Sequence, residues 1–79
     1  MTPEQCRAAR GWLGWSQHEL ARRASVGKNT IHEFEIGRRR PTRNNIAAIQ
    51  RALETAGICL LFDMVGDARG IEYRVPKSE

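Results

Sequence analysis

The segment from residue 16 to residue 37, SQHELARRASVGKNTIHEFEIG, reads as two short helices joined by a tight turn. Ser16 followed by Glu19 has the spacing of a capping box, in which the hydroxyl accepts from a backbone N–H and the carboxylate reaches back. Trp15 and Leu20 have the spacing of the accompanying hydrophobic staple. Small and apolar residues then recur where two crossing helices must touch, at Ala21, Ala24, Val26, Ile31 and Phe34.

This packing leaves a polar face on the second helix, which predicts a helix-turn-helix that reads DNA. Its outward positions are Lys28, Asn29, His32 and Glu33. Asparagine suits bidentate pairing to adenine, lysine suits the guanine acceptors, and glutamate can accept from the cytosine amino group. Two alternatives stay open. Lys28 and Asn29 could serve only to cap the helix, since position 27 is glycine, and Glu33 could pair with a nearby arginine.

The excess positive charge is uneven along the chain. Thirteen Lys and Arg residues against nine Asp and Glu give a formal net charge of +4 at pH 7. Arg38, Arg39, Arg40 and Arg43 crowd one loop at the end of the candidate recognition helix. In isolation such a run is a solvated charge cluster. In this position it predicts contacts to phosphates.

Residues 1–57 contain the residues that typically begin and end helices, for four helices in succession. Thr2 with Gln5 forms a first capping box, with Pro3 at the first helical position. Pro41 and Thr42 precede the last helix, whose apolar residues repeat at helical spacing until Gly57. The expected helices are 3–13, 17–24, 28–36, and one that ends before residue 57.

A C-terminal hairpin follows from the change of pattern after Gly57. Residues 58–62 are continuously apolar, residues 71–75 alternate, and the stretch 63–70 is rich in turn residues. We expect one domain over 1–79, with a helical core at 1–57, the hairpin at 58–75 and a frayed tail at 76–79.

The first strand is apolar at every position, so both of its faces require cover. Because a domain of 79 residues is small, we expect the hairpin to be a dimerisation element. The expected contact residues are Ile58, Leu60, Phe62, Ile71, Tyr73 and Val75. The alternative is that the hairpin covers its own helices, Trp12 in particular, and that dimers form only on DNA.

Other function classes find little support in the residues. Cys6 and Cys59 lack CxxC spacing and no secretory leader precedes them, so we expect reduced cysteines in a cytoplasmic protein. With His18 and His32 they do not form a zinc pattern, and we expect neither a metal nor a cofactor. No nucleophile has a plausible base and orienting partner, so we do not expect an enzyme. No apolar window is long enough to span a membrane, so we expect no membrane partner.

From Gln5 to Leu53 the chain resembles the Xre/Cro phage-repressor family of helix-turn-helix DNA-binding proteins. The segments that carry the resemblance are CRAARGWLGWSQHELARRA, NTIHEFEIGRRRP and IAAIQRAL. These segments, with Pro41 at the end of the second, follow one another in the order that the family has. The resemblance implies a mainly α fold, a four-helix lambda-repressor-like DNA-binding domain, to which the small C-terminal β-hairpin is added.

The resemblance also implies roles for individual residues. Gln17 matches a residue that contacts a phosphate and steadies side chains on the third helix. Arg10 and Glu35 match a structural ion pair, and the outward residues of the third helix match the positions that read base edges. The residues that we expect to bind phosphates are Gln17, Thr30, Arg38, Arg39, Arg40 and Arg43.

Two positions depart from the family pattern in the turn. Ser25 stands where glycine is usual, and Gly27 stands where a polar helix cap is usual. We therefore expect either a left-handed backbone at Ser25, at a cost of about 1 kcal/mol, or a reshaped turn.

The residues and the resemblance together predict a transcriptional regulator that binds double-stranded DNA. The expected form is a repressor that acts as a homodimer on a palindromic operator. The alternative is the antitoxin of a toxin–antitoxin pair, which binds a toxin protein and represses its own operon.

Overall fold

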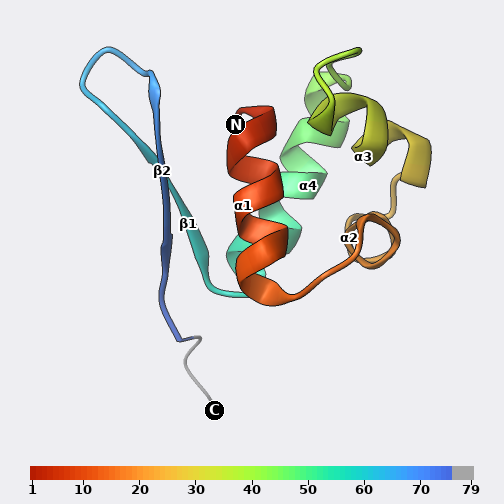
Figure 1. The fold of residues 1–79 in the computed structure, drawn as a ribbon, viewed down its shortest axis with the longest axis horizontal. Coiled ribbons are helices and arrows are strands. Elements are labelled where there is room, and N and C mark those ends of the chain that lie inside the picture. Colours follow the sequence, from red (N-terminus) through yellow and green to blue (C-terminus); the bar gives the residue numbers. More distant parts are fainter. Residues whose placement is uncertain (76–79) are drawn as a thin grey trace.

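The computed structural model describes residues 1–75, and the tail expected at 76–79 lies outside the described residues. Four helices precede a two-stranded antiparallel hairpin (Figure 1). The predicted mainly α fold with a C-terminal hairpin is confirmed. The elements are α1 (Pro3–Leu13), α2 (Gln17–Ala24), α3 (Lys28–Glu35), α4 (Arg43–Thr55), β1 (Ile58–Phe62) and β2 (Ala68–Tyr73).

Two boundaries of the predicted helices differ in the structure. Helix α3 ends at Glu35 and not at Ile36, which has left the helical region at φ −89° and ψ 2° ahead of Gly37. Arg43 is the first residue of α4 and not part of the preceding loop, because Thr42 caps the helix by accepting from the Asn45 N–H at 3.2 Å.

The two predicted capping boxes differ in outcome. The box of Thr2 and Gln5 is complete. Ser16 accepts from the Glu19 N–H at 3.0 Å, but the return bond from the carboxylate, which the sequence predicted, is absent. The Glu19 carboxylate instead binds Arg22 at 2.5 Å and Arg23 at 2.6 Å. Two guanidinium groups one turn along the helix are stronger partners for an anion than one neutral N–H.

The turn between α2 and α3 keeps its shape through strain at Ser25. This residue has φ 57° and ψ 42°, the left-handed conformation that the sequence predicted as one alternative. The Val26 N–H then donates to the Ala21 carbonyl at 3.0 Å and closes the end of α2. The tight turn is therefore preserved without glycine, at a cost of order 1 kcal/mol.

The core lies where the four helices meet and where β1 begins. Small residues on α1 and α2 allow close approach of the neighbouring helices. The buried apolar residues are Cys6, Ala9, Leu20, Ala21, Ala24, Ile31, Phe34, Ile49, Leu53 and Ile58.

The second strand of the hairpin begins at Ala68 and ends at Tyr73, whereas the sequence predicted 71–75. The turn is compact because the Asp63 carboxylate accepts from the N–H groups of Val65 and Asp67. Gly70, which falls in the stretch predicted as a turn, lies inside the strand opposite Leu61 with φ 134°, which glycine adopts without strain. Val75 therefore lies beyond the strand.

One side chain attaches the hairpin to the helices. The Gln5 amide nitrogen donates to the Leu61 and Gly70 carbonyls at 3.0 and 2.9 Å, while its oxygen accepts from the Thr2 N–H. At the other end of α1, the rings of Trp12 and Tyr73 lie 5.7 Å apart. Trp12 thus contacts the hairpin, as the alternative from the sequence proposed, although 63% of its surface remains exposed and it is not a core residue.

Candidate nucleic-acid interface

The outward face of α3 carries side chains without partners in the protein. Lys28, Asn29 and His32 are exposed and Glu33 is half-buried. Within residues 1–75, none of these four side chains makes a hydrogen bond or an ion pair, and Gly27 leaves the helix without a side-chain cap. The two alternatives from the sequence, capping by Lys28 or Asn29 and pairing of Glu33 with an arginine, are not observed.

A groove runs between α3 and the segment that leads into α4, and we call it the loop groove. It brings two candidate base-reading residues, Asn29 and Glu33, beside candidate phosphate-binding residues on the facing segment. The lining residues are Asn29, Thr30, Glu33, Arg39, Arg40, Pro41, Thr42 and Asn45.

A second groove lies on the other side of α3, against α1 and the start of α2, and we call it the α1 groove. Its lining residues are Pro3, Glu4, Arg7, Arg10, Gln17, His32, Glu35, Ile36 and Gly37. Arg7 was missed by the sequence reasoning. Its guanidinium is exposed and donates to the backbone carbonyl of Glu35. The available signal was its position three residues before Arg10, on the same face of α1.

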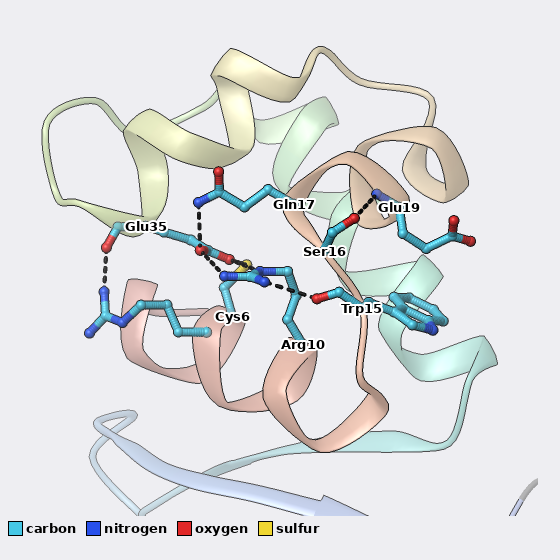
Figure 2. Close-up of polar contacts among 8 residues, drawn as sticks. Cys6, Arg10, Trp15, Ser16, Gln17, Glu19 and Glu35 are labelled. Carbon is cyan, nitrogen blue, oxygen red and sulfur yellow. Dashed lines mark hydrogen bonds and ion pairs between the residues drawn. The ribbon is translucent and has the colours of Figure 1, made fainter.

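Behind the α1 groove, the C-terminal end of α3 is fixed by a buried carboxylate (Figure 2). Glu35 is only 2% exposed, and Arg10 binds it through two nitrogens, each at 2.7 Å. The Gln17 amide donates to the same carboxylate at 3.0 Å and the Cys6 thiol at 3.1 Å. Arg10 also donates to the Trp15 carbonyl at 2.9 Å. This network joins α1, the start of α2 and the end of α3.

The network sets the protonation of its members. Burial raises the pKa of Glu35, but the hydrogen bonds from Arg10, Gln17 and Cys6 outweigh it and leave the pKa below its usual value. Burial and the Glu35 carboxylate both raise the pKa of the Cys6 thiol. Glu35 is therefore ionised, and Cys6 is a protonated hydrogen-bond donor and not a nucleophile.

The basic segment after α3 is held by its backbone and leaves its side chains outside. The N–H groups of Arg38 and Arg39 donate to the Glu33 carbonyl at 2.9 and 3.2 Å. Arg40 donates to the Met1 carbonyl and lies 5.8 Å from the Phe34 ring centre. All three arginines are exposed, as is Arg43.

The helix N-termini fall into two electrostatic groups. Helices α1 and α2 carry an acid in the first turn, Glu4 and Glu19. Helices α3 and α4 carry none, and they begin with Lys28 and Arg43. Because the helix dipole is positive at the N-terminus, cations there are unfavourable unless an anion lies nearby.

The candidate dimerisation residues divide between the core and the surface. Ile58 is 2% exposed, and Leu60 and Ile71 pack against the core. The other three, Phe62, Tyr73 and Val75, are exposed. One face of the hairpin therefore covers its own helices, as the alternative from the sequence proposed.

Two other kinds of feature are absent from the described part of the chain. Within residues 1–75, no group of three or more histidine, cysteine or acidic residues could hold a metal ion. None of the helices described is both long and apolar enough to cross a membrane.

Comparison with known proteins identifies the fold family. A search of curated proteins gave no match. The family model described as a helix-turn-helix domain matches residues 4–58, which is more than half of the chain and includes all four helices apart from Pro3, the first residue of α1. The chain therefore belongs to the helix-turn-helix domain family, a family of DNA-binding proteins.

Proposed function

We propose that this protein is a transcriptional regulator of the Xre/Cro type that binds double-stranded DNA in a sequence-specific way. In this proposal it is a repressor without enzymatic activity, and it acts as a homodimer on a palindromic operator in the cytoplasm. The observation that carries the proposal is the outward face of α3, where four polar side chains lack partners between two grooves lined with arginines.

In the proposed complex α3 enters the major groove and the two grooves beside it receive the two DNA backbones. A helix fits the major groove, and its N-terminal residues meet the base edges. Arg39 and Arg40 then face one backbone from the loop groove. Arg7 and Gln17 face the other from the α1 groove, which also contains the acid Glu4.

The charges at the helix N-termini support this arrangement. Lys28 and Arg43 begin the two helices that have no acid in the first turn. Phosphates beside α3 and α4 would offset the repulsion between these cations and the helix dipoles. Helices α1 and α2, whose first turns contain Glu4 and Glu19, already have anions there.

Within the major groove the proposed roles follow from side-chain chemistry. Asn29 pairs with adenine, Lys28 donates to guanine, and Glu33 accepts from the cytosine amino group. His32 lies on the same face and also lines the α1 groove. Thr30 and Gln17 contact phosphates, and Gln17 is already oriented by its hydrogen bond to Glu35.

The homodimer is proposed because one short recognition helix reads only a few base pairs. Two copies related by a two-fold axis present their helices about 34 Å apart, to successive major grooves. Because one face of the hairpin packs on its own helices, the proposed contact moves to its remaining surface. Of the exposed apolar residues of the strands, Leu61 lies on that surface, whereas Phe62 and Tyr73 alternate onto the face of Ile58 that packs on the helices.

Selection of duplexes from a random DNA library tests the proposal. The expected result is enrichment of an inverted repeat whose half-sites are about 10 base pairs apart, centre to centre. A selection that enriches no sequence, while the protein remains folded, would contradict specific binding. Enrichment of a single half-site would retain the DNA-binding function and reject the homodimer.

One observation favours the antitoxin alternative as a second function. Met64 and Val65, in the turn of the hairpin, are the most exposed large apolar residues of the described part of the chain, at 103% and 82%. An apolar tip of this kind is available for contact with another protein. A neighbouring reading frame whose product is toxic, and is neutralised by co-expression of this chain, would support the alternative.

A further inference from the structure

The hairpin has two open edges, and they differ in their protection against further strand pairing. The β2 edge contains Arg69 and Glu72, and the register shift opposite Leu61 and Phe62 places an extra residue in this strand. Charges and bulges are the usual devices that discourage pairing at an edge. The β1 edge has neither, since Ile58–Phe62 contains five apolar residues and the extra residue at the register shift belongs to β2.

The hydrogen bonds between the strands show which backbone groups of β1 point outward. The Arg74 N–H donates to the Gly57 carbonyl at 2.8 Å. Because hydrogen-bonded and non-hydrogen-bonded pairs alternate in an antiparallel ladder, Cys59 and Leu61 direct their backbone groups toward β2. Ile58 and Leu60 direct theirs away, and within residues 1–75 no backbone bond outside the hairpin engages them.

We propose that a second copy of this chain pairs with the β1 edge, antiparallel and centred on Leu60, to form a four-stranded sheet. The proposal rests on the homodimer of the proposed function and assigns its interface. Strand β1 is complementary to itself, because it contains no charge and pairing with its own copy therefore brings no like charges together. A charged peptide would find no counter-ion on this strand.

The symmetry of this pairing suits DNA. The two-fold axis that relates two antiparallel strands of one sheet is perpendicular to that sheet. Both helical bodies therefore lie on the same face of the four-stranded sheet, so the two copies of α3 can meet one duplex. Figure 1 shows that the hairpin and α3 lie on opposite sides of α1 and α4, which leaves α3 free of the proposed interface.

The backbone groups of β1 that point away from β2 define the register of the proposed pairing between the two copies. Leu60 pairs with the partner's Leu60, and Ile58 pairs with the partner's Phe62, each through backbone hydrogen bonds. Cys59 then lies opposite the partner's Leu61 in a non-hydrogen-bonded pair, with Cα atoms about 4.5 Å apart. Cys59 and the partner's Cys59 are offset by two residues along the strand, which is beyond the reach of about 7 Å for a disulfide.

The test is disulfide cross-linking of the full-length protein carrying the substitution Leu61→Cys. Leu61 is 37% exposed, so its replacement leaves the core intact. Under mild oxidation we expect most of the variant to run at twice the monomer mass on a non-reducing gel, and to return to monomer with a reducing agent. The wild type and the double variant Cys59→Ser/Leu61→Cys are the matched controls, and neither should cross-link.

Sedimentation of the same proteins, alone and with an enriched duplex, separates the outcomes. A non-covalent dimer in which Leu61→Cys fails to cross-link would overturn the β1 interface and leave the proposed dimer intact. Cross-linking of the wild type through Cys59 would overturn the register. A protein that stays monomeric on DNA would overturn both the interface and the homodimer, while specific binding in the library selection would still support DNA recognition.

Discussion

The two ends of helix α3 use their polar residues in opposite ways. At the C-terminal end, Glu35 is buried and its carboxylate accepts hydrogen bonds from Arg10, Gln17 and Cys6. Near the N-terminal end, Lys28 and Asn29 make none within residues 1–75. Buried polar groups require partners, whereas exposed ones can keep water until a ligand replaces it. One end therefore positions the helix, and the other is free to bind.

The largest expected effect belongs to the buried end. Glu35→Ala should lower the free energy of unfolding by about 3 kcal/mol, because it leaves the Arg10 guanidinium without its counter-ion. Thermal or urea unfolding measures this loss. Glu33→Ala, two residues earlier on α3 and without a side-chain partner within residues 1–75, is the control and should change stability by less than about 0.5 kcal/mol. Superimposable unfolding curves for Glu35→Ala and wild type would refute the structural role.

Acid should weaken the same network. The pKa of Glu35 in the folded protein lies below its usual value, so the unfolded state binds the proton more readily. The stability from this carboxylate is therefore complete above the unfolded pKa of about 4.3 and is lost as the pH falls through the folded pKa. Urea unfolding in steps of about one pH unit, from about pH 7 down to about pH 3, should show a loss of unfolding free energy. This loss should be smaller in Glu35→Gln than in the wild type. An equal acid loss in both proteins would contradict it.

At the exposed end, substitution should change recognition and not stability. Asn29→Ala should reduce discrimination at one base position of each half-site by about 1 to 3 kcal/mol, since the bidentate amide is lost. Competition binding against operator variants substituted at single positions measures this change. If the variant weakened binding to every sequence equally, Asn29 would be a backbone contact and not a base-reading residue.

The smallest expected effect concerns single arginines beside the recognition helix. Arg39→Ala should weaken binding to all sequences by similar factors and reduce the salt dependence by about 1 per subunit, because one phosphate contact is lost. Arg7→Ala provides the equivalent change in the α1 groove. Arg51→Ala, an exposed arginine on α4 outside both grooves, is the control. A variant of Arg39 that alters sequence preference would contradict this assignment.

The sequence predicted the helices well because their signals are local. Thr2 and Gln5 form the cap that the spacing predicts, and Gly14 ends α1 with φ 71°. The turn at Ser25 was predicted as one of two alternatives, and the left-handed one is observed. Local chemistry of this kind is settled within a few residues, so a single sequence contains the information.

The sequence could not predict competition between partners distant along the chain. Glu19 has the spacing to cap α2, yet two arginines bind it instead. Gln5 reaches the carbonyl groups of Leu61 and Gly70, far along the sequence, and this contact directs one face of the hairpin to its own helices. The side chains of Ile58, Leu60 and Ile71 therefore pack on the core of their own chain, which the expectation of side-chain contacts to a partner did not include.

The salt dependence of DNA binding tests the central claim, that arginine-lined grooves flank an exposed reading face on α3. The affinity for an enriched duplex is measured at several salt concentrations. If the dimer neutralises about 8 phosphates, the logarithm of the binding constant should fall with the logarithm of the salt concentration at a slope near −7. Binding that does not change with salt would contradict the account.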